Sequence, residues 1–401
     1  MTLTRKGFLG AGAMFAAGAF ADVPREGNGK VMMGFDETNL GPLAPGAWQP
    51  FSDRKVRMGI AGEGVCQFGS AFGYQNHPNS EVVACADVQP DRLKLLQERT
   101  QAKRTYASCE EMIEKEREID AVYIATDAPS HARLAIMALE HGLHVVTAVP
   151  AIFGENQLEL VPKLVEAVKR SGKVYQMNET TAFRANCFAM RKIFEGGGFG
   201  EIAYTEGEYF HYGVGKQVGS YKGWRVGLPP LWYATHSTGY FTCVTHRRFT
   251  EVTCLGRPAR DAADRRRRYG NPFGSEFAFL KCEGGGSARM TVSYDMPCVN
   301  SETGRCWGQL GSYVGDRYLG DAARIKDIQA LRPHLPPGMP AGGHGGSHGY
   351  LTDDFLRGIL LKGHRVCVDL KTALDTTVCG IYAHMSAMRD GETLKIPEMA
   401  V

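Results

Sequence analysis

Apolar residues between positions 55 and 172 form short, nearly continuous runs that alternate with amphipathic stretches. The runs that predict strands cover residues 56–61, 81–86, 119–125 and 144–147. The stretches with helical periodicity cover residues 90–100, 109–116, 129–141 and 157–171. Strands that are apolar on both faces and alternate with helices are typical of a parallel sheet covered on both sides. The pattern therefore predicts an α/β fold whose N-terminal domain, residues 55–172, is a doubly wound parallel sheet of the Rossmann type.

The pattern changes after residue 172. Strand-like runs at 202–209, 249–255, 277–282 and 288–294 follow one another with few helices between them. Helical patterns return only at 350–361 and 370–389. This predicts a C-terminal α+β domain, residues 173–401, with an open and mainly antiparallel sheet. The Gly-rich segment 338–349 is interpreted as a loop that its own contacts cannot order.

The first 54 residues show neither the helical nor the strand-like pattern of apolar positions. Arg5 and Lys6 precede an apolar run at 9–20 and an Ala-Phe-Ala sequence at 19–21. This order predicts an export signal over residues 1–22 of the twin-arginine type, with lysine in the second place, and hence a periplasmic protein. The run is too short for a stable membrane span, and a disordered or membrane-tethered N-terminus is the alternative. Residues 23–54, rich in Gly and Pro, predict an extended N-terminal arm.

Composition narrows the class of protein. The 401 residues suffice for two domains, and 43% hydrophobic with 22% charged residues is typical of a globular enzyme. A formal net charge of +3 is too small to indicate a nucleic-acid partner. None of the 11 cysteines forms a C-x-x-C pair, so zinc-ribbon or thioredoxin chemistry is not indicated.

Gly62 and Gly64 follow the first predicted strand directly and precede a helix, which is the context of a dinucleotide-binding turn. Gln67 stands where the third glycine of that turn is usual, and Gly69 follows two residues later. Asp87 ends the second strand, where a carboxylate binds a ribose 2′-hydroxyl and repels a 2′-phosphate. These residues predict NAD rather than NADP as the cofactor. A Rossmann-like domain without a cofactor is the alternative.

Three longer motifs carry a resemblance to a known family. They are GIAGEG at 59–64, ATDAPSHARLA at 125–135 and HGLHVVTAVPA at 141–151. Together with Asp87 they resemble the Gfo/Idh/MocA family of oxidoreductases. The resemblance implies that the first domain binds NAD and that the second carries a site for a small-molecule carbohydrate and a homo-oligomer interface. It also implies cofactor contacts for Gly62, Gly64, Gln67, Thr126, His131 and Pro150.

The chain departs from ordinary dehydrogenases of that family at Ala148-Val149-Pro150, where they have Glu-Lys-Pro. The lysine assists proton transfer at the substrate hydroxyl, and Val149 cannot. A nearer branch has Glu-Val-Pro here and includes NAD-dependent α-N-acetylgalactosaminidases. The motifs that resemble this branch are MNETTAFR at 177–184, GEYFH at 207–211, GWR at 223–225, YATHSTG at 233–239 and GHGGSH at 343–348. Even there, Ala148 replaces an acid, Ala182 replaces an active-site tyrosine, and His348 stands near the place of an aspartate.

Tyr233 and His236 are the leading catalytic candidates, because they share one short segment and imidazole exchanges protons near neutral pH. Glu179 follows a predicted strand at 173–177, at a sheet end where ligands gather in such folds. It would replace the acid missing at Ala148, although a structural ion pair fits equally well.

The expected substrate contacts are spread over three segments. Tyr209 and His211 share one face of a strand by alternation, and an ordinary sheet histidine is the alternative for His211. Trp224 and Arg225 offer an aromatic platform and a charged donor. The histidines of the Gly-rich loop, His344 and His348, would close over a sugar. A metal bound by His211, His236, His344 and His348 is conceivable, but their spacing does not demand it, and no metal site is predicted.

Three functions remain open. The first is an exported NAD-dependent glycosidase that removes hydride from the sugar C3, eliminates the group on C1 and returns the hydride. The second is a sugar dehydrogenase in which Tyr233 or His236 replaces the lost lysine. The third is a non-catalytic sugar-binding protein of the same fold. Export favours the first, because an enzyme that regenerates its own NAD⁺ needs no external pool of cofactor.

Overall fold

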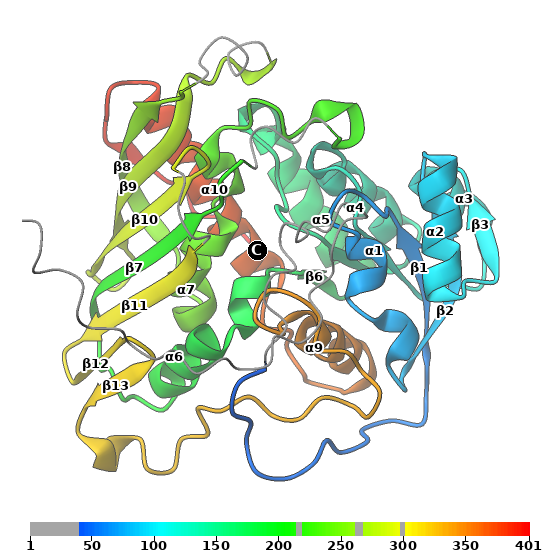
Figure 1. Ribbon diagram of the computed structural model, residues 1–401, viewed down its shortest axis with the longest axis horizontal. Coiled ribbons are helices and arrows are strands. Elements are labelled where there is room, and N and C mark those ends of the chain that lie inside the picture. The colour runs from blue at the N-terminus through cyan, green and yellow to red at the C-terminus, as the bar shows by residue number, and fades with distance from the viewer. Residues whose placement is uncertain (1–39, 214–218, 261–267, 297–300) are drawn as a thin grey trace, which may run out of the picture.

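The computed structural model describes residues 40–213, 219–260, 268–296 and 301–401. Two sheets stand on opposite sides of the molecule, with helices packed between them (Figure 1). The expected export signal at 1–22 and the first part of the arm lie outside the described residues. The described part of the arm is extended, and its Ala44 N–H donates to the carbonyl of Arg332. The Trp48 indole donates to Asp353 at 3.0 Å.

The N-terminal sheet has six parallel strands in the order β3-β2-β1-β4-β5-β6. Their bounds are β1 Val56–Ala61, β2 Ser80–Ala86, β3 Arg104–Tyr106, β4 Ala121–Ile124, β5 His144–Thr147 and β6 Tyr175–Met177. The predicted doubly wound parallel sheet is confirmed, since every pair of neighbouring strands is parallel. The expected domain boundary at residue 172 is too early, because β6 completes this sheet. The three-residue edge strand β3 was not predicted, because its half-buried residues show no apolar run.

Five helices accompany this sheet. They are α1 Phe68–Ala71, α2 Pro90–Thr100, α3 Cys109–Lys115, α4 His131–Glu140 and α5 Val161–Ser171. The predicted helix at 90–100 matches α2 at both ends. Helix α1 is a single turn, so the segment after the glycine turn holds few aligned peptide groups.

The C-terminal sheet has eight strands in the order β13-β12-β11-β7-β10-β9-β8-β14. Their bounds are β7 Ile202–Phe210, β8 Phe249–Pro258, β9 Phe273–Cys282, β10 Ser287–Ser293, β11 Ser301–Gly308, β12 Gly311–Val314, β13 Arg317–Gly320 and β14 Leu394–Lys395. The prediction of a mainly antiparallel sheet is confirmed, since β7 and β10 are the one parallel pair among the described strands of this sheet.

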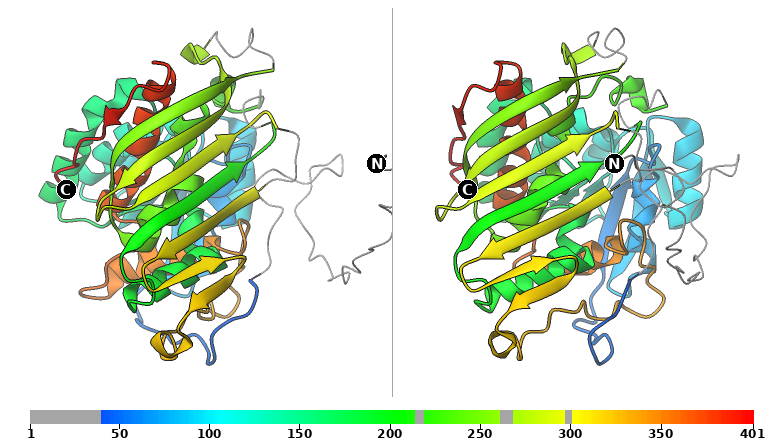
Figure 2. Two further views of the ribbon diagram at one scale, coloured as in Figure 1. Left: turned by 90° about the vertical axis from the view of Figure 1, so that its left-hand side faces the viewer. Right: turned by 60° about the vertical axis from the view of Figure 1, so that its left-hand side comes forward.

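Three helices cover the inner face of this sheet: α6 Ala185–Glu195, α7 Thr235–Thr245 and α10 Leu370–Ala387. The helical patterns read from the sequence did not include α6 and α7. Every residue of α7 is buried, so its sequence has no polar face and no amphipathic period to detect. Helix α7 can pack closely on β7 because Gly207 has no side chain. A Cβ there would lie 2.0 Å from the carbonyl oxygen of Ser237. No helix of the described chain covers the outer face of the sheet (Figure 2).

Helix α9, His348–Leu360, returns to the N-terminal domain although it belongs to the last part of the chain. The Thr352 hydroxyl donates to the carbonyl of Phe72 at 2.7 Å, and the Gln176 amide donates to the carbonyl of Leu351 at 2.9 Å. The expectation that residues 173–401 form one separate unit therefore fails at α9. The interpretation of 338–349 as a loop without ordering contacts was also wrong, because His348 begins α9 and accepts from the Gly343 N–H at 3.2 Å.

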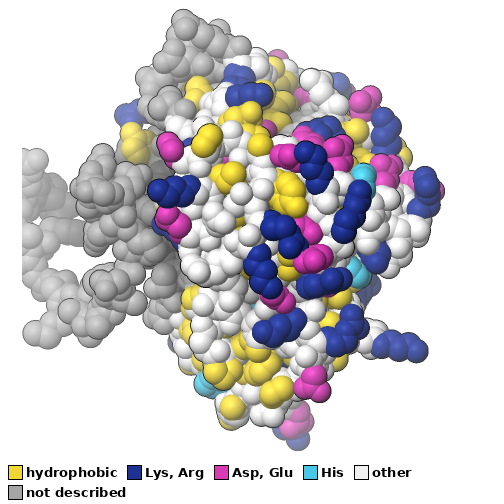
Figure 3. All heavy atoms as spheres, turned by 90° about the vertical axis from the view of Figure 1, so that its right-hand side faces the viewer, with side chains coloured by type: hydrophobic (Ala, Val, Ile, Leu, Met, Phe, Trp, Pro, Cys, Tyr) yellow, Lys and Arg dark blue, Asp and Glu magenta, His cyan; other side chains and the backbone are white. Residues whose placement is uncertain are grey.

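The described surface is of mixed charge. On the side that carries the N-terminal sheet, Lys and Arg side chains are interspersed with Asp and Glu (Figure 3). Several form ion pairs, including Arg57 with Asp120 and Arg133 with Glu110. The ten described cysteines are free thiols. None of the helices within the described ranges is long and apolar enough to cross a lipid bilayer.

Candidate active site

The turn after β1 is held by two glycines that have no room for a side chain. Gly62 has a φ of +98°, and a Cβ there would lie 2.4 Å from the carbonyl oxygen of Ala125. A Cβ on Gly69 would lie 2.3 Å from the carbonyl oxygen of Gly62. Gly69 therefore allows α1 to pack on the turn, the role usually taken by the third glycine. The third glycine is displaced by two residues rather than lost.

Asp87 lies at the end of β2 and is fixed by backbone donors. Its Oδ2 accepts from the Glu63 N–H and its Oδ1 from the Gln89 N–H, both at 2.8 Å. Glu63 is buried beneath the turn, where it accepts from the Ser70 N–H and hydroxyl and pairs with Arg99. Burial raises the pKa of Glu63, and its bonds to Ser70 oppose that rise. Sequence reasoning missed Glu63, whose place within the glycine turn was the only available signal.

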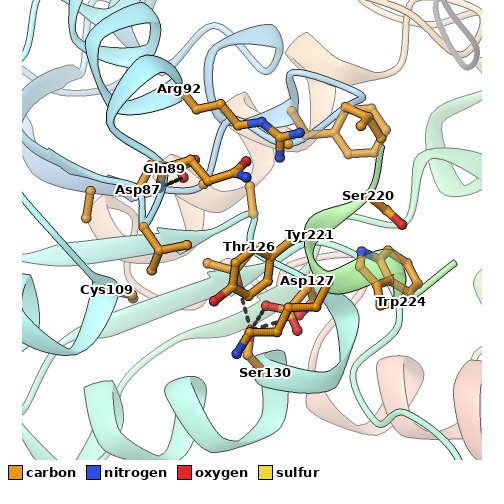
Figure 4. Close-up of a pocket in the computed structure, with 18 of the residues that line it drawn as sticks. Asp87, Gln89, Arg92, Cys109, Thr126, Asp127, Ser130, Ser220, Tyr221 and Trp224 are labelled. Carbon is orange, nitrogen blue, oxygen red and sulfur yellow. Dashed lines mark hydrogen bonds between the residues drawn. The ribbon is translucent and has the colours of Figure 1, made fainter. Parts of the chain in front are cut away.

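A cavity of about 320 Å³ opens beside this turn. Its walls include Gly62, Gly64, Asp87 and Thr126 from the N-terminal domain, and residues 220–222, 224 and 225 from the C-terminal domain. Figure 4 shows Tyr221 and Trp224 of the C-terminal domain together with Thr126, Asp127 and Ser130 of the N-terminal domain in its lining. A fixed carboxylate at one end and a side-chain-free turn are what NAD requires for its ribose and its diphosphate. The residues present therefore fit this cofactor.

Three of the expected cofactor residues lie outside the lining of the cavity. The Gln67 side chain is directed to Arg99, whose Nη1 donates to its Oε1 at 2.5 Å. His131 is buried, with Nδ1 2.9 Å from the carbonyl oxygen of Pro150 and Nε2 3.3 Å from that of Thr126. His131 and Pro150 therefore support the loop beneath the cavity instead of facing it. Burial lowers the pKa of His131.

A cluster of rings lies next to the cavity. It consists of Tyr209, His211, Tyr233, His236, His344 and His348, all of them buried. The centroid of the His236 ring is 4.6 Å from that of Tyr209 and 5.5 Å from that of Tyr233. It is 5.7 Å from that of His344. Phe68, which lines the cavity, lies 5.8 Å from His344. The structure thus brings together the residues expected to bind and transform a substrate, beside the residues that fit NAD.

Glu179 and His236 form a buried pair at the centre of this cluster. Nδ1 of His236 lies 2.9 Å from Oε1 of Glu179. Burial alone lowers the pKa of His236, but the charges of Glu179 and Glu302 oppose this and leave the pKa raised. Burial raises the pKa of Glu179, while the charge of His236 leaves it lowered overall. The pair therefore favours an imidazolium beside a carboxylate. Within the described residues, Oε2 of Glu179 has no hydrogen-bond partner.

Glu302 on β11 is a further member that sequence reasoning missed. Its Oε1 accepts from the Thr181 hydroxyl at 2.7 Å and lies 2.8 Å from Nε of Arg184. One ligand atom each of Glu179, His236 and Glu302 lies within 4.8 Å of the others, a set that could hold a metal ion. The four-histidine set considered from the sequence shares only His236 with it. Arg184 already balances the charge of Glu302, so the cluster does not need a metal for electrostatic balance.

The remaining rings are held in their neutral forms. Burial raises the pKa of Tyr233 to about 12, so its phenol keeps its proton and can donate a hydrogen bond. Burial lowers the pKa of His211 to about 4 and that of His348 to about 3. The pKa of His344 is also lowered by burial and by the neighbouring His348. Of the four histidines, only His236 has a raised pKa.

His348 is not placed to close over a substrate. Its ring stacks on Phe72 at 4.2 Å between centroids, at the start of α9. His344 lies between it and His236, with its Nδ1 3.0 Å from Nε2 of His348. His344 therefore borders the cluster, whereas His348 supports it from the core.

Comparison with known proteins agrees with this geometry. Residues 56–179 match the sequence model of an oxidoreductase family, the NAD-binding Rossmann fold of Gfo/Idh/MocA proteins. The predicted NAD-binding domain is thereby confirmed.

Curated relatives match the chain over a shorter stretch. A glycosyl hydrolase family 109 protein of Porphyromonas gingivalis is 34% identical over 164 residues, which are 39% of this chain and 34% of that protein. A family 109 protein of Bacteroides thetaiotaomicron is 31% identical over 196 residues, 46% of this chain and 41% of that protein. The matched stretch thus spans less than half the length of these relatives.

Solved structures share the fold of both domains. An inositol dehydrogenase homolog from Azotobacter vinelandii, complexed with NAD⁺, has a TM-score of 0.67 at 19% identity and covers 86% of this chain and 98% of its own. The scyllo-inositol dehydrogenase of Lactobacillus casei, with bound NAD(H) and scyllo-inositol, has a TM-score of 0.65 at 13% identity, over 85% and 99%. At this identity the likeness concerns the fold.

Proposed function

Since the chain carries an NAD-binding Rossmann domain of the Gfo/Idh/MocA oxidoreductase family, we propose that the whole protein is an NAD-dependent enzyme acting on sugars. We further propose that it cleaves a glycosidic bond without net oxidation. The buried Glu179–His236 pair carries this proposal, because it offers a proton-exchanging group one ring away from Arg225 in the lining of the cofactor cavity.

The proposed reaction passes through a ketone of the sugar. When NAD⁺ is bound, it would supply the hydride acceptor for C3 while a base takes the proton of the C3 hydroxyl, and both would return at the end of the cycle. The ketone acidifies the proton on C2, so a base removes it while the bond from C1 to the leaving group breaks. Water then adds to C1, and a proton returns to C2. The protein must supply a group that exchanges a proton and a donor that orients the ring.

His236 and Tyr233 divide these roles. The carboxylate of Glu179 orients the His236 ring through Nδ1 and favours its charged form, so Nε2 exchanges the proton at C2 or at the leaving oxygen. Tyr233 keeps its proton and donates a hydrogen bond to a sugar hydroxyl. Tyr209, His211 and His344 border the space where the sugar binds.

Val149 leaves the proton of the oxidised hydroxyl to another group, in glycoside cleavage and in simple dehydrogenation alike. It is buried and carries no proton to exchange at the substrate hydroxyl. The two curated relatives described above, both named as glycosyl hydrolases, favour glycoside cleavage. A second candidate, an NAD-dependent sugar dehydrogenase, is favoured by the fold neighbours, two of which are inositol dehydrogenases or homologs of them.

Solvent exchange at C2 separates the proposed route from direct hydrolysis. Cleavage of an aryl glycoside in D₂O is expected to give a sugar product with deuterium at C2, because the C2 proton leaves and returns during each turnover. A product without deuterium, formed at a rate that depends on NAD, would contradict the elimination step.

Location and assembly complete the proposal. The sequence at residues 1–22 supports export to the periplasm, where an enzyme that recycles its own NAD needs no cofactor pool. The uncovered face of the C-terminal sheet supports a homo-oligomer. Leu255, Phe277 and Phe279 of the paired strands β8 and β9 are exposed, and such apolar patches mark contact sites.

A further inference from the structure

Arg225 is a buried cation without a carboxylate partner among the residues that the structure describes. Arg225 lies in the wall of the cofactor cavity, and the whole residue is 7% exposed. Its Nη2 lies 3.8 Å from Sγ of Cys66, and its Nε has no partner. The guanidinium lies 4.5 Å from the centroid of the Trp224 ring and 5.3 Å from that of Tyr233. The guanidinium also shares a side-chain hydrogen bond with Tyr233, and none of these neighbours is a carboxylate.

The two other buried arginines of the described chain donate to several carbonyl oxygens each. Arg191 donates to the carbonyls of Ala182 and Cys243. Arg332 donates to those of Phe183, Gly345 and Leu40, although its Nε has no partner in that part of the chain. Arg184, which is partly buried, pairs with Glu302. A buried charge without such compensation is costly, so Arg225 is built for a partner that arrives from outside the chain.

The surroundings of Arg225 indicate which anion would be its partner. Gly62, Gly64 and Cys66 line the same cavity, and the backbone of this turn approaches the diphosphate of a dinucleotide. The one-turn helix α1 adds little positive charge of its own, because few peptide dipoles align in it. A guanidinium, by contrast, pairs with phosphate oxygens in a bidentate manner.

The segment that carries Arg225 is held across the cavity. Arg92 on α2 donates to the carbonyl of Gly219 at 3.1 Å, which ties the segment to the N-terminal domain. The Arg225 N–H donates to the Ser220 hydroxyl at 3.2 Å, and the Gly223 N–H donates to the Ser220 carbonyl at 2.7 Å. The guanidinium is therefore positioned before any ligand binds.

We propose that Arg225 of the C-terminal domain binds the diphosphate of NAD and keeps the cofactor in place through successive turnovers. The proposal rests on the proposed NAD-dependent function and adds to it the residue that retains the cofactor. It explains why a residue of the C-terminal domain lines the nucleotide cavity, and why no carboxylate of the described chain balances its charge.

The test measures cofactor binding without any substrate, so it is independent of glycosidase activity. Titration calorimetry with NAD⁺, ADP-ribose and adenosine compares the wild-type protein with the Arg225→Gln and Arg225→Lys variants. We expect Arg225→Gln to weaken NAD⁺ and ADP-ribose by about 10- to 100-fold, the loss expected for a charged hydrogen bond. Arg225→Lys keeps the charge and should lose less. Adenosine, which has no phosphate, should bind all three proteins equally.

A matched control and a folding check accompany these titrations. Lys222→Gln removes another cation that lines the cavity, on the same segment but exposed, and should weaken NAD⁺ less than Arg225→Gln. Circular dichroism melting identifies any variant that fails to fold. If Arg225→Gln fails, the NAD⁺ affinity of Arg225→Lys is compared with that of the wild type instead. Unchanged NAD⁺ affinity in Arg225→Gln would overturn the proposal. If KM for a carboxylated sugar rose at the same time, Arg225 would belong to the substrate instead.

Discussion

Nδ1 of His236, at the start of α7, lies 2.9 Å from Oε1 of Glu179, just after β6. This contact joins the carboxyl end of the parallel sheet to the helix that covers the antiparallel sheet. The pair thus lies where the two domains meet, beside the cavity that fits NAD. The proposed function depends on it, because it contains the one histidine of the ring cluster whose pKa is raised.

Replacing His236 by Ala should lower kcat by about a hundredfold or more, because general acid–base groups contribute at least that much. NAD binding should be unchanged, since His236 does not line the cofactor cavity. His348→Gln is the matched control, because His348 supports the cluster from the core and should affect stability more than kcat. Near-normal turnover in His236→Ala would remove His236 from the mechanism.

Replacing Glu179 by Gln should shift the pH dependence of the reaction. The carboxylate raises the pKa of His236, so its loss should move the limb of the pH–rate profile that belongs to His236 to lower pH. A purely structural Glu179 would lower the rate at every pH without moving that limb. Steady-state rates measured across the pH range, for wild type and Glu179→Gln, decide between the two.

The pair should also stabilise the fold within a limited pH window. His236 has a raised pKa, so its contribution is complete below the ordinary value of 6.5 and is lost as pH rises through its folded pKa. Glu179 has a lowered pKa, so its contribution is complete above 4.5 and is lost as pH falls through its folded pKa. The difference in Tm between wild type and Glu179→Gln should therefore be largest between about pH 4.5 and 6.5. A constant difference from pH 4 to 9 would contradict a charged pair.

Acid should destabilise the protein through its neutral buried histidines. His211 and His348 have folded pKa values of about 4 and about 3, against 6.5 when unfolded. The unfolded chain binds more protons below pH 6.5. The stability that the two neutral histidines contribute is therefore fully present above that pH and is lost as the pH falls toward 4. Each group contributes up to about 1.4 kcal/mol per pH unit. His348→Phe should reduce the loss of Tm between pH 7 and pH 5, and an unaltered pH dependence would refute the assignment.

Substitutions at two glycines of the turn should have different effects on stability and on NAD binding. Gly69→Ala places a Cβ 2.3 Å from a backbone oxygen and should lower Tm strongly, together with NAD content. Gly64→Ala meets no atom within 4 Å and should fold normally, yet bind NAD more weakly because its methyl group faces the diphosphate. Thermal melting and cofactor content after dialysis report the two effects separately. Equal NAD binding by Gly64→Ala and wild type would contradict the placement of the diphosphate.

The uncovered sheet face gives a prediction about assembly. Phe279 is 55% exposed near Leu255, which is 61% exposed. Phe279→Lys should break an oligomer that uses this face, because a charge would be buried without a partner. Light scattering should show a smaller mass for the variant at unchanged helix content. An oligomer that tolerates Phe279→Lys would place its contact elsewhere.

The N-terminal sheet could be predicted because its strands are short and nearly continuous apolar runs, as at Val56–Ala61 and Ala121–Ile124. Helix α7 could not, because burial on all sides removes the polar face that reveals a helix. The residues that fit NAD followed from local spacing, apart from the displaced Gly69. Glu302 could not be found, because its partner Thr181 is 121 residues away. The position of His348 was predicted wrongly, because the sequence of a Gly-rich segment does not reveal whether contacts with distant residues order it.

The relation between aglycone release and NADH formation tests the account most directly. Purified protein with bound NAD is incubated with a panel of aryl glycosides, and the released aglycone and the absorbance of NADH are followed together. The account predicts many equivalents of aglycone per protein with no net NADH, since each hydride is returned. NADH accumulating in proportion to oxidised sugar, or no release from any glycoside, would contradict it.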